Sequence, residues 1–96
     1  MDILFHVATA EGARILLPLV RACARAGRSF ACFFTFDGVL ALRNEALRQA
    51  LSHAERTAVC EESWHRFRHD APCPVELGSQ TVASALMGEA ARVVSL

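Results

Sequence analysis

Short apolar runs alternate with amphipathic stretches along the first half of the chain. Asp2–Ala8 is mostly apolar, and in Ala13–Ala26 Leu, Ala and Arg recur at helical spacing. Ser29–Phe36 is aromatic and apolar on both alternating faces, which is typical of a central parallel strand covered by helices on both sides. Asp37-Gly38 interrupts this run, and helical spacing resumes over Val39–His53. We therefore predict strand, helix, strand and helix in this order.

The second half of the chain continues the alternation. Its predicted elements are a strand over Arg56–Cys60, a short polar helix or turn over Glu61–Asp70, a strand over Cys73–Leu77, a helix from Ser79 or Thr81 to Met87, and a strand over Ala91–Leu96. Connections this short fit a compact three-layer α/β/α sandwich. A chain of 96 residues closes one core, so we expect a single domain over residues 1–96.

The first predicted helix has two unusual features. Pro18 lacks the N–H that would bond the carbonyl of Arg14, so the helix is either kinked at Pro18 or starts late. Arg14, Arg21, Arg25 and Arg28 fall on one side of the same helix. This side is a solvated face or a site for a partner or an anion, and amphipathic surface helices favour the solvated face.

Composition and charge exclude several classes of protein. Hydrophobic residues make up 53% of the chain, and ten arginines without any lysine balance ten acidic residues. This balance argues against disorder and against general nucleic-acid binding. The longest apolar run, Ile15–Val20, is far short of the roughly 20 residues of a membrane span. The start Met1-Asp2 lacks the basic residues of a signal peptide, so we expect a cytoplasmic protein.

Four cysteines in a cytosolic chain are not expected to form two disulfides. Ligands of a parallel sheet bind at the carboxyl ends of the strands, and Cys60 is the one cysteine predicted to lie there. Cys23 and Cys32 fall among apolar positions and are expected in the core. Cys73 begins the fourth predicted strand, at the opposite edge, where packing is its simplest role.

Cys60 is either a reactive thiol or a passive residue at the end of a strand. A helix starting after Cys60 stabilises the thiolate through its dipole, and His65 and Arg66 are near in sequence. Glu61 and Glu62 oppose this effect, because adjacent carboxylates disfavour another negative charge. The residues alone leave both alternatives open.

A metal site is a further alternative at the same place. Cys60, His65, His69 and Cys73 have the spacing Cys-x4-His-x3-His-x3-Cys, and two thiolates with two imidazoles form a common tetrahedral zinc set. The spacing matches no standard zinc finger, and the two cysteines are predicted at opposite ends of neighbouring strands. Solvent-exposed histidines on a polar connection are the simpler interpretation.

Three segments together resemble the DsrE/DsrF/DsrH superfamily, which includes the Tus sulfur-relay proteins. Phe33–Val39 is similar to the family's second strand, an aromatic run that leads into an Asp-Gly-Val turn. Cys60 falls at the end of the third strand, where sulfur-carrying members have their cysteine. Val75–Leu96 is similar to the family's last strand, helix and strand.

The resemblance implies a five-stranded parallel sheet and a small sulfurtransferase-like carrier. In such a carrier Cys60 would accept sulfane sulfur as a persulfide and pass it to a partner thiol, without a metal or organic cofactor. We expect His65 and Arg66 to help hold the thiolate, Gly78 and Ser79 to shape the pocket, and Asp37 of the Asp-Gly-Val turn to contribute to binding.

The resemblance also bears on partners. It implies sulfur donor and acceptor proteins and assembly into trimers or hexamers, either of this chain alone or with related subunits. Some members lack the cysteine and serve as structural subunits, so a noncatalytic oligomeric subunit that binds a partner protein is the alternative. Neither nucleic acid nor a membrane is expected as a partner.

Overall fold

The computed structural model describes residues 1–96 and has five parallel strands in one sheet. The strands are β1 (Ile3–Val7), β2 (Phe30–Phe34), β3 (Arg56–Cys60), β4 (Glu76–Gly78) and β5 (Arg92–Ser95). The α-helices are α1 (Ala10–Ala26), α2 (Glu45–Ala50), α3 (Glu61–Arg68) and α4 (Gln80–Glu89), and the 3-10 helices are η1 (Phe36–Arg43) and η2 (Leu51–His53). The strand order is β4-β3-β2-β1-β5.

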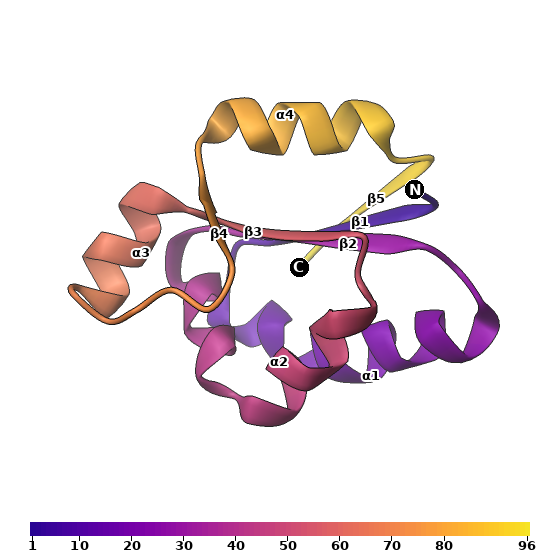
Figure 1. The fold of residues 1–96 in the computed structure, drawn as a ribbon, viewed down its shortest axis with the longest axis horizontal. Coiled ribbons are helices and arrows are strands. Elements are labelled where there is room, and N and C mark those ends of the chain that lie inside the picture. Colours follow the sequence, from indigo (N-terminus) through magenta and orange to yellow (C-terminus); the bar gives the residue numbers. More distant parts are fainter.

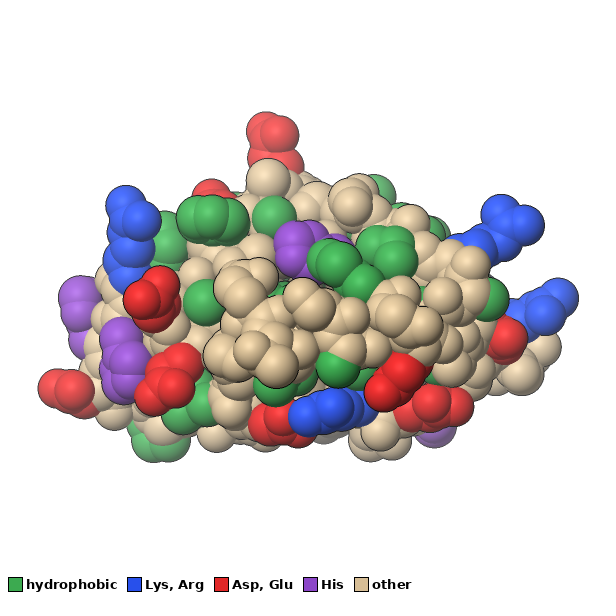
Figure 2. Space-filling view, turned by 90° about the horizontal axis from the view of Figure 1, so that it is seen from above, with side chains coloured by type: hydrophobic (Ala, Val, Ile, Leu, Met, Phe, Trp, Pro, Cys, Tyr) green, Lys and Arg blue, Asp and Glu red, His purple; other side chains and the backbone are tan.

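Helices cover both faces of this sheet, as Figure 1 shows, so the predicted three-layer α/β/α sandwich is confirmed. Helices α1 and α2 lie on one face and α4 on the other, while α3 extends from the carboxyl end of β3. Seen from the α4 side, acidic and histidine side chains gather at the end where Figure 1 has α3 (Figure 2). None of the helices combines the length and the hydropathy that crossing a membrane requires.

The central strand β2 links two hydrophobic cores. All five of its residues are buried, as predicted for a strand covered on both faces. Phe30, Cys32 and Phe34 point into the larger core beside α1 and α2, whereas Ala31 and Phe33 belong to the smaller core beside α4. The side-chain period of two explains this division.

Helix α1 starts earlier than its apolar spacing predicts. The Oγ1 atom of Thr9 accepts a hydrogen bond of 2.8 Å from the N–H of Gly12, which caps the helix ahead of Ala10. Pro18 therefore lies inside the helix, so the late start, one of the two predicted alternatives, is wrong.

The arginines of this region are exposed to solvent, and Arg28 follows the end of α1 instead of lying on it as predicted. All four are exposed, and none takes part in an ion pair within the chain; they are Arg14, Arg21, Arg25 and Arg28.

The single helix predicted over Val39–His53 is wrong, because this stretch folds as η1, α2 and η2. The backbone at Gly38 passes so close to β1 that an added Cβ would collide with the carbonyl oxygen of Val7. Asn44 then adopts an extended conformation, and its Oδ1 accepts a 3.2 Å hydrogen bond from the N–H of Leu47. Asn44 thus interrupts the first segment and caps the next one.

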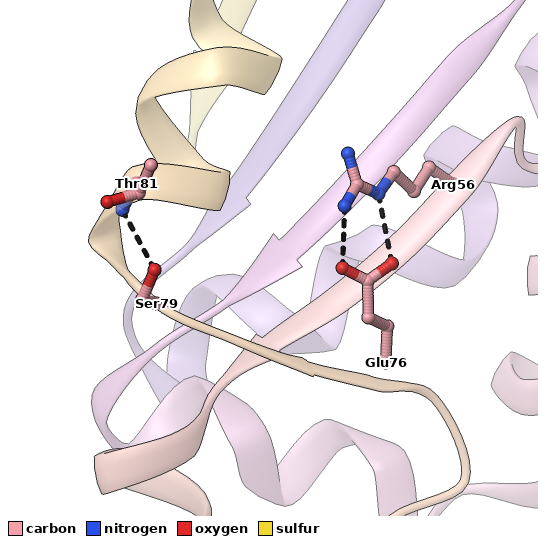
Figure 3. A network of polar contacts seen from close by, with 4 residues as sticks. All are labelled: Arg56, Glu76, Ser79 and Thr81. Atoms are coloured by element: carbon pink, nitrogen blue, oxygen red, sulfur yellow. Dashed lines mark hydrogen bonds and ion pairs between the residues drawn. The ribbon is translucent and has the colours of Figure 1, made fainter.

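Strand β4 is shorter than predicted and is joined to β3 by an ion pair. It begins at Glu76 instead of Cys73, and the carboxylate of Glu76 accepts two hydrogen bonds, of 3.0 and 2.6 Å, from the guanidinium of Arg56 (Figure 3). The hydrogen bond from Arg56 lowers the pKa of the Glu76 carboxyl. The resulting register sets Gly78 beside Cys60 at the carboxyl edge of the sheet.

Three of the four thiols are packing residues in this fold. Cys23 and Cys32 are buried in the larger core, as predicted, and burial raises the pKa of both thiols. Cys73 is half-buried against the same core, and burial raises its pKa as well. The fourth thiol, Cys60, belongs to the smaller core and lies in a different environment.

Candidate functional site

Cys60 occupies the junction between the sheet and a helix. It is the last residue of β3, and its extended backbone makes it the N-cap of α3. Only 8% of the residue is exposed. The thiol therefore lies at a helix N-terminus, where backbone N–H groups without helical partners and the helix dipole favour a negative charge.

Two buried hydroxyl groups accompany Cys60. Thr35 directly follows β2, and because Phe34 is in register with Val59, Thr35 comes level with Cys60. Ser63 lies in the first turn of α3, with its Oγ 3.3 Å from the Oγ1 of Thr35. Thr35 and Ser63 are 3% and 6% exposed, so little water competes for these hydroxyls.

Ser63 also fixes the backbone after Thr35. Its Oγ accepts a 2.8 Å hydrogen bond from the N–H of Phe36, whose φ of 50° is in the left-handed region. This conformation is unfavourable for a residue other than glycine, and the hydrogen bond helps to compensate for it. The phenylalanine is 58% exposed, so its ring is not anchored in either core.

The surroundings of Cys60 favour its thiolate. Burial alone would raise the pKa of the thiol, but hydrogen bonding from Ser63, Thr35 and the backbone N–H of Glu62 outweighs burial. Ser63 contributes through both its N–H and its hydroxyl. The net result is a Cys60 pKa below the ordinary value, opposite in direction to the other three cysteines.

Cys60 lines a pocket of about 450 Å³ between two helix N-termini. Helix α3 and the segment entering α4 supply the other lining residues, which are Glu61, Glu62, His65, Gly78, Ser79 and Gln80. Ser79 caps α4 through a 3.2 Å hydrogen bond from the N–H of Thr81 to its Oγ (Figure 3).

The predicted site residues divide into two groups. His65, Gly78 and Ser79 line the pocket together with Cys60. Asp37 and Arg66 are not among the residues that line it. Asp37 lies in the first turn of η1, and the exposed Arg66 has its guanidinium 5.5 Å from the ring centre of Phe67.

The alternative metal set is not assembled. No group of three or more His, Cys, Asp or Glu side chains is arranged to hold a metal ion. Cys60 belongs to the smaller core, whereas Cys73 packs against the larger one on the other face of the sheet. His65 instead approaches Glu61, with 3.8 Å between Nε2 and Oε1.

The sequence interpretation assigned no role to Thr35 or Ser63, although a signal for both was present. The ends of adjacent parallel strands meet at one edge, which brings Thr35 toward Cys60. The third residue of a helix often reaches back to the N-cap, and Ser63 holds this position. Neither rule reveals that the two hydroxyls contact each other, because this depends on the burial of both side chains.

The comparison with known proteins shows the fold. No family model and no curated protein sequence matches the chain. Its structure is similar to the crystal structure of the ychN protein from E. coli, with a TM-score of 0.71 and 14% sequence identity over 100% of this chain and 99% of the other. The two chains therefore share one fold over their whole lengths. At this level of identity the likeness extends to the fold alone.

Proposed function

We propose that this chain is a sulfur-relay protein whose Cys60 accepts sulfane sulfur as a persulfide and passes it to a partner thiol. The observation that carries the proposal is the environment of Cys60, whose thiol has a lowered pKa and lines a pocket at the carboxyl edge of the sheet. The DsrE-like fold supports the proposal by analogy.

The transfer needs no external oxidant or reductant. The Cys60 thiolate attacks the outer sulfur of a donor persulfide, R–S–SH, forming a new S–S bond while the donor's S–S bond breaks. The donor leaves as a thiolate and takes up a proton from water. In the second step an acceptor thiolate attacks the outer sulfur of Cys60–S–SH, and Cys60 leaves as a thiolate. The outer sulfur keeps its oxidation state throughout, and the site needs no cofactor.

The same groups that stabilise the thiolate suit both steps. A thiolate is the attacking species in the first step and the leaving group in the second, so a lowered pKa assists both. The pocket provides room for the outer sulfur beside Gly78 and Ser79. Cys73 lacks this environment, because its pKa is raised by burial.

Intact-mass measurement tests the proposal. The reduced protein, incubated with a low-molecular-weight persulfide or inorganic polysulfide, is expected to gain the mass of one sulfur. The Cys60→Ser variant should lose this gain, and the matched Cys73→Ser variant should retain it. Peptide mapping after alkylation then locates the added sulfur at Cys60. No gain with any donor, or a gain that survives in Cys60→Ser, would overturn the proposal.

A second candidate is a noncatalytic subunit of a homo-oligomer or of a hetero-oligomer with related chains. The observation that favours it is Phe36, a large apolar residue that is 58% exposed next to the site. Association with a second copy or a partner protein would cover this ring. Light scattering together with thiol labelling decides between the candidates, since an oligomer with an unreactive Cys60 supports the subunit role.

A further inference from the structure

The charges around the pockets of this molecule are unevenly distributed. Of the five pockets, the four others are each lined by two or three arginines. The Cys60 pocket has none, and its charged lining residues are Glu61 and Glu62, together with the titratable His65. The formal net charge of zero therefore conceals a local acidic environment at the candidate site.

The two carboxylates are held near the pocket by the helix. Glu61 and Glu62 occupy the first turn of α3 and are both exposed to solvent. Glu61 has a single long contact with the exposed His65, and Glu62 has no basic partner. Acidic and histidine side chains gather at this end of the molecule in Figure 2, where a basic side chain also lies, although no arginine lines the pocket itself. A reagent approaching Cys60 thus meets negative charge that no arginine of the pocket offsets.

Different groups act on the Cys60 thiolate and on an anion that approaches it. Hydrogen bonding from nearby hydroxyl and N–H groups lowers the pKa of Cys60 and so favours a negative charge on its sulfur. Charges on the pocket lining act over longer distances and raise or lower the local concentration of a charged reagent. The Cys60 site therefore combines a stabilised thiolate with an entrance that repels anions.

We propose that the Cys60 pocket selects its sulfur donor by charge, and that Glu61 and Glu62 are the residues that determine this specificity. The preferred donor is a persulfidated cysteine in a basic segment of a partner protein, and thiosulfate and other small anionic donors react slowly. This inference rests on the proposed function for its donor, whereas the charge selection itself can be measured without sulfur transfer.

Charged thiol reagents provide the measurement. The full chain carrying Cys73→Ser is treated with a trimethylammonium-ethyl or a sulfonatoethyl methanethiosulfonate, and the rate of adduct formation at Cys60 is followed by mass. Each rate is divided by the rate of the same reagent with a free low-molecular-weight thiol. We expect the cationic reagent to be favoured by about tenfold at low salt, and the preference to shrink as salt is added.

Charge-neutral variants identify the source of the preference. Glu61→Gln/Glu62→Gln should bring the normalised ratio close to one. The matched control is Glu55→Gln/Glu89→Gln, which removes the same charge from two exposed residues outside the pocket and should keep the wild-type ratio. Equal rates in the wild type, an unchanged ratio in the pocket variant, or no labelling by either reagent would overturn the inference. An unchanged ratio would mean that the two carboxylates interact favourably with the dipole of α3 but do not select between reagents.

Transfer from donor peptides separates this inference from the proposed function. Two persulfidated peptides, one with Arg and one with Glu beside the cysteine, are compared as donors to Cys60. Faster transfer from the basic peptide, with the difference removed by Glu61→Gln/Glu62→Gln, supports the inference. Equal transfer overturns it and leaves the proposed function intact. If no donor transfers sulfur, the proposed function fails, and with it the assignment of a donor.

Discussion

The hydroxyl of Ser63 serves two neighbours of opposite character. It accepts from the N–H of Phe36 at 2.8 Å, and it favours the thiolate of Cys60. A hydroxyl can do both because it has one proton to donate and two lone pairs to accept with. The conformation of Phe36 and the chemistry of Cys60 are thus coupled through one buried side chain.

Ser63→Ala is expected to raise the pKa of Cys60 and to cost about 1–2 kcal/mol of stability, because the N–H of Phe36 loses its partner. The pKa is measured from the pH dependence of iodoacetamide alkylation in the Cys73→Ser background. The midpoint for Cys60 should lie below that of free cysteine and move upward in the variant, so that alkylation at neutral pH slows several-fold. The exposed Ser84 provides a control, since Ser84→Ala should leave the midpoint in place. A midpoint that does not move would remove Ser63 from the site.

At the scale of the elements, apolar periodicity predicts a helix or strand correctly where tertiary packing and the local pattern favour the same element. Strand β2 could be predicted because all its positions are apolar, and β3 because it ends at Cys60 before a polar stretch. Periodicity failed over Val39–His53, where the extended backbone of Asn44 and its side-chain cap divide the predicted helix between η1 and α2. A competing side-chain hydrogen bond of this kind is not included in a count of apolar spacing.

Prediction of the candidate site from the sequence is limited in the same way, because it depends on contacts between side chains. Gly78 and Ser79 could be placed near Cys60 because the carboxyl ends of adjacent parallel strands meet. Arg66 could not be placed, because proximity in sequence does not determine which side of a short helix a residue occupies. Its side chain lies over Phe67 and outside the pocket.

The ion pair between β3 and β4 has an effect that should depend on pH. Since hydrogen bonding from Arg56 lowers the pKa of Glu76, the pair stabilises the fold above the ordinary glutamate pKa, and this contribution is lost as the pH falls through the lowered value. The side chains are 40% and 41% exposed, so Glu76→Gln should lower Tm by a few degrees or less at neutral pH.

Thermal unfolding at neutral and strongly acidic pH checks this prediction. The difference in Tm between wild type and Glu76→Gln should disappear in acid, where the carboxyl is protonated in both the folded and the unfolded state. Glu55→Gln, an exposed substitution without an ion pair, serves as the control. An equal loss of Tm at both pH values would show that Glu76 acts through packing instead of charge.

At the scale of the whole molecule, the two cores are joined through one strand. Residues of β2 alternate between the core beside α1 and α2 and the core beside α4, so neither can be fully exposed while β2 keeps its place. Cys32 lies in this strand with no exposed surface and a pKa raised by burial. Access to its sulfur therefore requires β2 to leave the sheet.

Thiol labelling of Cys32 should consequently report global unfolding. A domain of this size is expected to be stable by at least about 5 kcal/mol, so Cys32 should be protected at least about 1,000-fold relative to the unfolded chain. The labelling rate is measured at increasing urea concentration, with peptide mapping to locate the label, and the free energy obtained should equal that from circular dichroism. Cys73, which is half-buried, should be labelled faster in native buffer and serves as the internal reference. A Cys32 rate that is independent of urea would instead reveal local opening, and with it two cores that do not unfold together.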